Sequence, residues 1–106
     1  MFARIVTIPL KGGSRSEYAK TIEKSVIPLL RTHKGFLDEI AMVSSDGTTS
    51  IGISLWDSRE SAEAYNRSDF GEVMKALEPV AAGPAQVQPC DVTNSTAHKL
   101  ALAASA

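Results

Sequence analysis

Three segments of the chain have the alternation and composition typical of β-strands. Residues 2–8 alternate, are rich in β-branched side chains and stop at Pro9, so we expect a first strand there. Residues 36–43 and 49–56 have the same character and are separated by a turn in which Asp46-Gly47 suits a tight hairpin. These segments predict three strands, of which the last two form a hairpin.

A fourth, weaker strand is predicted for residues 85–92, which follow the helix-breaking pair Gly83-Pro84. Pro89 lies within this segment and has no N–H for a sheet ladder, so we expect a sheet edge or a bulge here. Residues 93–106 are small and rich in alanine, which predicts a C-terminal tail.

The segment between the first two strands has the period of a helix. Ser14 and Glu17 have the spacing of a capping box, which predicts where the helix begins. One stripe of side chains then recurs at steps of three and four: Tyr18, Ile22, Val26, Leu29 and His33. Pro28 removes a backbone donor inside this stripe, so we expect a kink near residues 24–25 or an early end. Gly35 suits a left-handed C-cap.

A second helix is predicted after the third strand. Asp57 or Ser58 is expected to cap it, and it runs towards Asn66. Asp69 and Glu72 repeat the capping-box spacing, which predicts a second start. The apolar stripe of this second half consists of Phe70, Val73, Met74 and Leu77.

The order of these elements is β-α-β-β-α-β, which favours an α+β fold. We expect a ferredoxin-like sandwich, in which a four-stranded antiparallel sheet carries two helices on one face. In the second strand, one side is expected to hold Phe36, Ile40 and Met42, and the other Leu37, Ala41 and Val43. Because two helices cover only one face, the second apolar face predicts a homodimer formed sheet against sheet.

Length and composition fit one domain of a soluble globular protein. The chain has 106 residues, of which 43% are hydrophobic and 22% charged. Its formal net charge of −1 predicts neither nucleic-acid binding nor attraction to a membrane surface. Cys90 is the only cysteine, which excludes an internal disulfide and a multi-cysteine metal site. The N-terminal apolar run lacks the features of a signal peptide, so we expect a cytoplasmic protein.

Three stretches carry a resemblance to a known family: Ile27-Pro28-Leu29-Leu30-Arg31 before Gly35-Phe36, Leu55-Trp56-Asp57-Ser58-Arg59-Glu60, and Tyr65 through Ser68-Asp69-Phe70. In these stretches the chain resembles the antibiotic biosynthesis monooxygenase (ABM) family of the dimeric α/β-barrel superfamily. The resemblance implies a single domain over residues 1–92 that pairs into a dimeric α/β barrel. It also implies a cofactor-independent monooxygenase, without metal or flavin, that acts on a small aromatic, phenolic or quinol-type compound.

The family's functional positions match this chain only in part. Heme-degrading members use an Asn on the first strand, a Trp at the end of the third strand and a heme-ligating His on the second helix. Trp56 matches, but Ile5 and Met74 stand at the other two positions, which disfavours heme degradation. Members that form polyketide quinones pair the Trp with an Asn four residues earlier, where Gly52 stands.

Trp56 and His33 are the candidate catalytic residues. We expect Trp56 to form a pocket wall that orients a flat substrate; the other interpretation is a core residue with a bonded indole N–H. His33 has the chemistry of a base for phenol deprotonation, although the helix dipole is the more ordinary reason for a histidine at a helix end. By the resemblance, the substrate site is expected to contain Ile5, Tyr18, Gly52, Ser54, Tyr65, Phe70 and Met74.

Arg4 also has two interpretations. It is either an anchor for an anionic substrate or one half of an ion pair across the dimer with Asp38 or Glu39, and we favour the ion pair.

The alternative function is a non-catalytic dimeric barrel that binds a small hydrophobic metabolite as a carrier, sensor or stress-response module. The lack of converging polar groups in the sequence favours this alternative. An isomerase or cyclase of the same superfamily would need an acid–base pair, which the sequence does not reveal.

Overall fold

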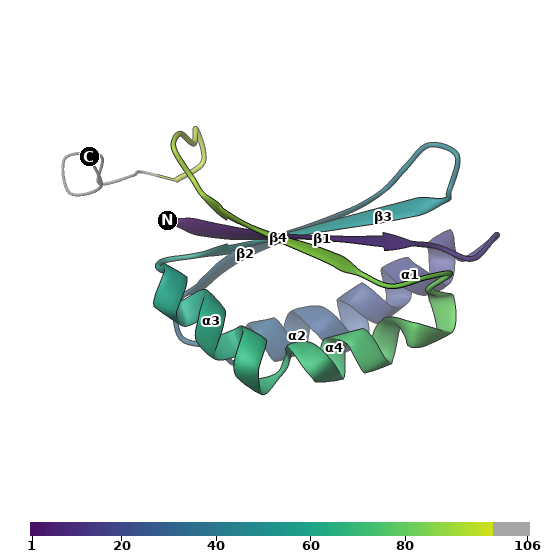
Figure 1. The fold of residues 1–106 in the computed structure, drawn as a ribbon, viewed down its shortest axis with the longest axis horizontal. Helices are drawn as coiled ribbons and strands as arrows, with labels where there is room; N and C mark the ends of the chain where they lie inside the picture. Colours follow the sequence, from purple (N-terminus) through teal and green to yellow (C-terminus); the bar gives the residue numbers. More distant parts are fainter. Residues whose placement is uncertain (99–106) are drawn as a thin grey trace.

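A computed structural model describes residues 1–98 of the chain. The elements are β1 (Phe2–Pro9), α1 (Arg15–Thr21), η1 (Ile22–Val26), α2 (Ile27–Leu30), β2 (Phe36–Val43), β3 (Thr49–Trp56), α3 (Arg59–Ser68), α4 (Phe70–Leu77), η2 (Glu78–Val80) and β4 (Gln86–Asp91). All the described helical segments lie on the same side of the sheet, and none of them covers the other side (Figure 1). The predicted element order is therefore confirmed.

The sheet has four antiparallel strands in the order β2-β3-β1-β4, which is the ferredoxin-like arrangement expected from the sequence. β4 lies at an edge, as Pro89 predicted. On the helix-facing side, rows of residues cross the sheet from β1 through β3 to β2: Phe2, Trp56 and Phe36; Arg4, Ser54 and Glu39; Val6, Gly52 and Ala41. These rows place residues from three separate strands side by side.

A bulge in β2 corrects the predicted faces of that strand. Phe36 pairs with Trp56, but Asp38 and not Leu37 pairs with Leu55, so β2 contains one extra residue. Because side chains alternate along a strand, this extra residue reverses the facing of everything that follows. Glu39 consequently faces the helices, whereas two residues expected beside Phe36, namely Ile40 and Met42, face away from them.

The first helical segment is continuous but irregular. Its middle, η1, is a π-helix that spans the place near residues 24–25 where a kink was expected, and the helix continues through Pro28 instead of ending early. The predicted capping box at Ser14 is wrong in one respect: the Ser14 side chain makes no capping hydrogen bond. Its backbone carbonyl instead accepts from the Tyr18 N–H at 2.8 Å. Gly35 has a φ of +87°, which confirms the left-handed turn.

The second helical segment is divided at Asp69. Ser58 caps α3 as predicted, because its hydroxyl accepts a hydrogen bond from the Ser61 N–H at 3.2 Å. The capping box predicted at Asp69 is not formed, since its side chain makes no hydrogen bond to the start of α4. The carboxylate is bonded instead to the His33 ring, 36 residues away in sequence.

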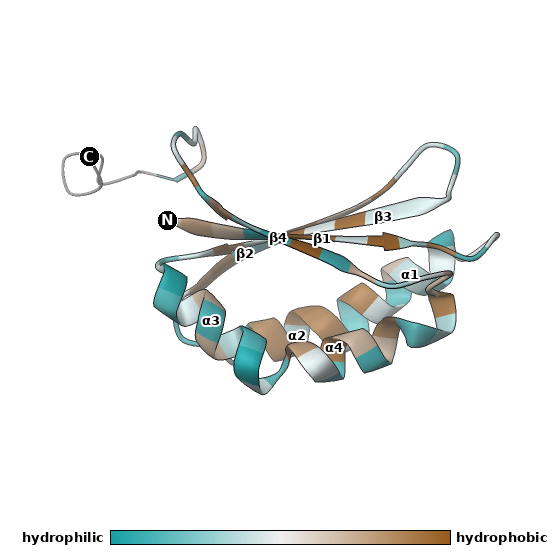
Figure 2. Cartoon of the chain, in the orientation of Figure 1, coloured by the Kyte–Doolittle hydropathy of each residue, from teal (hydrophilic) through white to brown (hydrophobic). Residues whose placement is uncertain are grey.

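The core lies between the sheet and the helices. Figure 2 shows that the apolar sides of the helical segments turn towards the sheet. The largest completely buried side chain is that of Trp56, which packs with the other buried aromatic residues Phe2, Tyr18 and Tyr65. This packing fixes the helices over one face of the sheet.

The opposite face of the sheet exposes apolar side chains. Ile5, Ile53 and Ile40 form one row across β1, β3 and β2 on this face. Ile40 is 51% exposed and Met42 is 43% exposed, which are large fractions for apolar side chains. This face has the character that a partner surface would bury.

The tail predicted for residues 93–106 is described only as far as His98, and residues 99–106 lie outside the described residues. The described part has no helix or strand. The Val92 N–H donates to the Met1 carbonyl at 3.1 Å. The His98 ring contacts the Asp38 carboxylate, so this part of the tail returns to β2.

Candidate functional site

A small cavity lies between the sheet and both helical segments. Its volume is about 30 Å³, and its wall is mainly apolar and aromatic. Six residues expected to bind a substrate line it: Tyr18, Gly52, Ser54, Tyr65, Phe70 and Met74. Arg4 and Glu39 line it as well, so the cavity contains a cation and a carboxyl group. A volume of this size holds a water molecule or a single polar substituent and is too small for an aromatic ring.

The polar side of the cavity is built by the row that contains Arg4, Ser54 and Glu39. Arg4 is 4% exposed, and its Nη2 donates to Asn66 Oδ1 of α3 at 2.8 Å. Its Nη1 is buried and has no hydrogen-bond partner among residues 1–98. The guanidinium carbon lies 4.3 Å from the centre of the Phe70 ring, so the cation rests on an aromatic face.

Glu39 faces the same cavity from β2. Burial raises the pKa of its carboxyl group to about 8, although the nearby Arg4 cation opposes this rise. Gly52 on the adjacent strand leaves the necessary space, because a Cβ there would lie 3.1 Å from Glu39 Oε1. A carboxyl group with this pKa accepts and returns protons in the neutral to mildly alkaline range.

Two tyrosines complete the polar side. Tyr18 comes from α1 and Tyr65 from α3, and both are almost fully buried. Burial raises the pKa of both phenols above the ordinary value, so both hydroxyl groups stay protonated at neutral pH. They therefore add hydrogen-bonding hydroxyl groups, and no charge, to the site.

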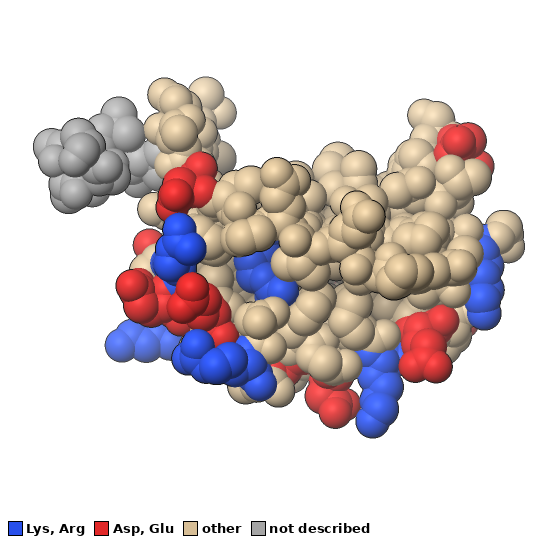
Figure 3. All heavy atoms as spheres, in the orientation of Figure 1, with Lys and Arg blue, Asp and Glu red and all other residues tan. Residues whose placement is uncertain are grey.

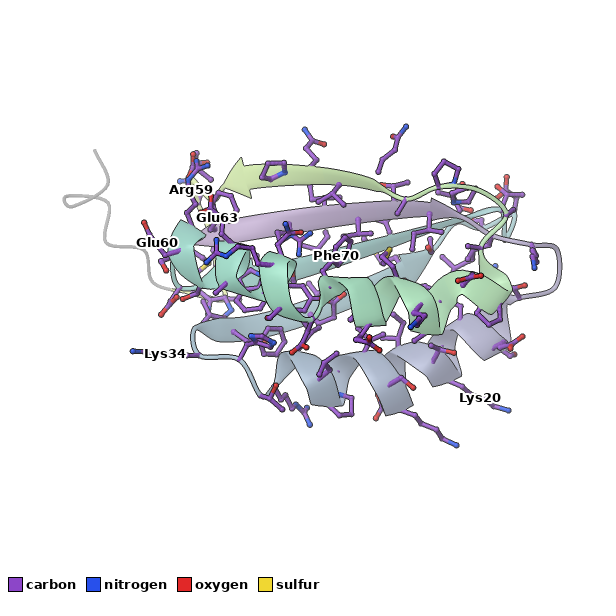
Figure 4. The ribbon with its side chains drawn as sticks, turned by 60° about the horizontal axis from the view of Figure 1, so that its bottom comes forward. Lys20, Lys34, Arg59, Glu60, Glu63 and Phe70 are labelled. Carbon is purple, nitrogen blue, oxygen red and sulfur yellow. The ribbon has the colours of Figure 1, made fainter. Side chains whose placement is uncertain are left out.

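A groove of about 360 Å³ lies beside the cavity, between α4 and β4. The groove and the cavity share four wall residues: Ile8, Phe70, Met74 and Leu77. In Figure 4, Phe70 lies between the helix layer and the sheet, whereas Lys20 and Lys34 project outward. Figure 3 shows basic atoms recessed in the middle of an uncharged part of this face. Movement of Phe70 and Met74 would join the two spaces.

Trp56 is placed differently from the sequence-based expectation of a pocket wall. Its side chain is 0% exposed and is not part of the cavity wall. The ring stacks on Tyr65 with 5.1 Å between ring centres, and Nε1 donates to Ser54 Oγ at 2.9 Å. Trp56 thus lies behind the cavity and positions two residues that do line it. This matches the interpretation of a core aromatic residue with a bonded N–H.

His33 is also outside the cavity wall. It lies in the turn after α2, and its Nε2 is 2.6 Å from Asp69 Oδ2. The ring makes edge contacts with Trp56 and Tyr65, whose centres lie 6.3 and 5.3 Å away. The expected base is therefore held against Asp69, where it connects the turn after α2 to the junction of α3 and α4.

Ile5 is a second correction. It pairs with Ile53 and lies on the uncovered face of the sheet, so it is not a cavity residue. The favoured ion pair of Arg4 across a dimer is wrong as well, because Arg4 and Glu39 both face the helices of their own chain. A charged residue at a strand position that faces the helices was the sequence feature that could have marked Arg4 and Glu39 as cavity residues. For Glu39 this signal was hidden by the bulge at Leu37.

Within residues 1–98, no set of three or more His, Cys, Asp and Glu side chains is gathered in a way that could hold a metal ion. The described helices include none that is long and apolar enough to cross a membrane.

Solved structures with the same fold include several from bacteria. A monooxygenase from the gene ActVA-Orf6 of Streptomyces coelicolor, in complex with the ligand nanaomycin D, is 25% identical with a TM-score of 0.74. The match covers 89% of this chain and 88% of that one. A protein of unknown function from Nitrosomonas europaea is 14% identical over 90% of this chain and 91% of its own, with a TM-score of 0.73.

A putative antibiotic biosynthesis monooxygenase from Caulobacter crescentus has a TM-score of 0.71 at 15% identity, over 88% of this chain and 90% of its own. No curated protein is similar enough in sequence to count as a relative. The model of the family described as antibiotic biosynthesis monooxygenase matches residues 1–76. The chain therefore belongs to the antibiotic biosynthesis monooxygenase family.

Proposed function

We propose that this protein is a cofactor-independent monooxygenase that acts on a small aromatic compound of the phenol or quinol type. The observation that carries the proposal is the cavity, whose apolar and aromatic wall encloses the Arg4 guanidinium and the Glu39 carboxyl group. The two groups supply a fixed positive charge and a proton acceptor. The family and the fold, shared with a monooxygenase that holds a ligand, support the same reaction class.

The electron balance of this reaction requires no external reductant. With a naphthol as the example, C10H8O and O2 give the quinone C10H6O2 and one H2O. One oxygen atom forms a new C–O bond to the ring, the O–O bond breaks, and the second oxygen leaves as water. The substrate loses four electrons and O2 gains four, so the protein needs only to deprotonate, orient and enclose the substrate.

Glu39 is the residue proposed to move protons. Its carboxylate form accepts the phenolic proton, and the resulting anion reduces O2 and combines with it to give a ring hydroperoxide. The protonated carboxyl group supplies the proton of the hydroperoxide. Removal of the ring C–H proton then expels hydroxide and forms the second carbonyl, and the proton ends in water. His33 is less suited to this role, because it is held by Asp69 behind the cavity wall.

The ring of the substrate is proposed to occupy the space between the cavity and the groove beside α4. Phe70 and Met74 line both of these spaces, and both side chains are only partly buried. Their displacement would admit a ring while the apolar wall continued to exclude water. A homodimer formed through the uncovered sheet face is part of the proposal, because the row of Ile5, Ile53 and Ile40 includes an exposed isoleucine, Ile40, and two partly exposed ones.

One observation favours the alternative, a dimeric barrel that binds a small hydrophobic metabolite as a carrier, sensor or stress-response module. The two residues expected to be catalytic, Trp56 and His33, both lie outside the cavity wall. A protein that only stores or senses a ligand needs no proton acceptor, so the role of Glu39 separates the two functions.

The test is oxygen uptake by the purified protein with a panel of hydroquinones, naphthols and anthrones. We expect one O2 consumed per substrate and, with ¹⁸O2, one labelled oxygen atom in the product. Glu39→Gln should lower kcat/KM by about 10²-fold or more, because it removes the proton acceptor. Glu63→Gln, at an exposed position of α3, is the matched control and should retain wild-type rates. Absence of enzyme-dependent uptake from the folded protein across the panel would favour the binding module.

A further inference from the structure

We propose that Arg4 determines which ligands this site accepts, by selecting aromatic compounds that carry an anionic oxygen substituent over neutral aromatics of the same shape. The inference rests on the proposed function for the identity of the site, but it concerns binding and does not depend on oxygenation. The ligand class is a phenolate, with its oxygen at Arg4 Nη1 and its ring towards the groove beside α4.

The first observation is an unused hydrogen-bond donor. Arg4 is 96% buried (4% exposed), one of its terminal nitrogens donates to Asn66, and the other has no partner among residues 1–98. A buried donor without a partner destabilises the folded protein, and more so when it is charged. Arg4 makes no ion pair within the described part of the chain. An anionic oxygen in the cavity would satisfy both the donor and the charge.

The second observation is the orientation of the guanidinium. Its central carbon lies 4.3 Å from the Phe70 ring centre and 5.3 Å from the Tyr65 ring centre. Asn66 bonds a third side of the group. These contacts hold the guanidinium in place before any ligand arrives, and Nη1, which has no partner among residues 1–98, is the donor left for a ligand oxygen.

The third observation is the size and position of the cavity. About 30 Å³ suits one oxygen substituent, while the adjoining groove of about 360 Å³ has the dimensions of a small-ligand site. The polar end of the site is therefore formed in advance, and the ring end opens when Phe70 and Met74 move. A ligand lacking the anionic oxygen would leave the Arg4 donor unsatisfied and would bind less tightly.

The charge balance of the site agrees with an anionic ligand. The titratable groups that face the cavity are Arg4 from β1, Glu39 from β2, Tyr18 from α1 and Tyr65 from α3. The pKa of Glu39 is raised by burial to about 8, so at pH 7 the carboxyl group is mainly protonated and Arg4 supplies a net positive charge. A phenolate would neutralise that charge without a competing carboxylate.

The experiment compares two probes of similar shape, 4-nitrophenol and its neutral methyl ether 4-nitroanisole. The phenol and phenolate forms of 4-nitrophenol absorb visible light differently, so a spectrophotometric titration gives the pKa of the bound probe directly. We expect the wild-type protein to lower this pKa by about one unit or more, which is a tenfold preference for the phenolate.

Two arginine variants make the test specific. Arg4→Met, which keeps an unbranched apolar side chain but removes the guanidinium and its charge, should weaken phenolate binding by about tenfold or more. Its affinity for 4-nitroanisole should change by less than about threefold, because the apolar contacts remain. Arg67→Met, at an exposed position of α3, is the matched control and should behave as wild type for both probes.

The outcomes separate this inference from the proposed function. A lowered probe pKa in the wild type, lost in Arg4→Met, supports the inference even if no phenol is oxygenated. An unchanged or raised pKa of the bound probe, equal binding of the two probes, or no binding of either would overturn it, even if oxygen uptake is observed. If Arg4→Met does not fold, the pKa of the probe bound to the wild-type protein is the result that supports or overturns the inference.

Discussion

Gly52 leaves the space that the carboxyl group of Glu39 occupies, since a Cβ on Gly52 would lie 3.1 Å from Glu39 Oε1. Gly52→Ala should therefore displace the carboxyl group, lower oxygen uptake by roughly tenfold and reduce the free energy of unfolding by about 1 kcal/mol. Gly12→Ala is the control, because nothing lies within 4 Å of a Cβ there. Equal behaviour of the two variants in thermal denaturation and oxygen uptake would contradict this relationship.

The raised pKa of Glu39 predicts a pH dependence of stability. Burial raises the pKa of the folded state to about 8 from an ordinary value of 4.5, so the folded protein holds a proton that the unfolded chain releases. The free energy of unfolding should fall as pH rises from about 4.5 to about 8, by roughly 4 kcal/mol over this range. The facing groups Arg4, Tyr18 and Tyr65 stay protonated over this range.

Glu39→Gln cannot ionise and should remove most of this fall, which urea denaturation at several pH values will measure. Glu63→Gln should keep the wild-type slope, because Glu63 is exposed. A slope shared by all three proteins would assign the pH dependence to groups other than Glu39.

Ser54 is expected to be important for stability as well as for the cavity. Its hydroxyl accepts the only donor of the buried Trp56 ring at 2.9 Å. Ser54→Ala leaves the indole N–H without a partner and should cost about 1–3 kcal/mol of unfolding free energy. Ser68→Ala removes an exposed hydroxyl bonded to Ala64 and should cost less than about 0.5 kcal/mol. Similar losses of unfolding free energy in the two variants would show that the buried hydrogen bond from Trp56 to Ser54 stabilises the fold no more than the exposed one.

The contact between His33 and Asp69 predicts local stability at the start of α4. His33→Ala should destabilise the fold by about 1–2 kcal/mol and speed amide exchange in the first turn of α4, beside Phe70. Lys34→Ala, at the exposed neighbouring position, should leave exchange in that turn unchanged. Hydrogen exchange measured by mass spectrometry distinguishes these outcomes. Unaltered exchange in His33→Ala would show that the contact with Asp69 does not stabilise the start of α4.

The uncovered sheet face predicts self-association. Ile53 lies at the centre of that face, between Ile5 and Ile40. Ile53→Asp places a charge there and should convert a dimer into a folded monomer, as measured by sedimentation velocity. Lys20→Asp, on the exposed side of α1, should leave the dimer intact. A wild-type protein that sediments as a monomer would refute the proposed interface.

The element order and the fold were predictable because they depend on short-range signals. The alternation in residues 2–8, the Asp46-Gly47 turn and the stripe that begins at Tyr18 each act within a few residues. The position of β4 at a sheet edge also followed locally, from the missing N–H of Pro89.

The candidate site was less predictable, because it depends on register and on distant partners. The extra residue at Leu37 reverses β2 and brings Glu39 to the cavity, and no local feature of the sequence marks it. Asp69 has the spacing of a capping residue, but its carboxylate is bonded to the ring of His33, which follows the other helical segment. Trp56 was expected to form a pocket wall, but it lies behind the cavity and stacks on Tyr65, a depth that only the packed structure reveals.

The π-helical segment η1 sets the rotational phase between the two halves of the first helical segment. A π-helical turn contains one residue more than an α-helical turn, so η1 acts as a single-residue insertion between Tyr18 and Leu30. Deleting one exposed residue of η1, such as Glu23, would let the segment become a regular α-helix. Tyr18 and Leu30 would then be eleven residues apart in a regular helix, which at 100° per residue puts them about 20° from the same direction. Both side chains would still face the sheet, so η1 is where the helix takes up an extra residue while its two halves keep the same buried side.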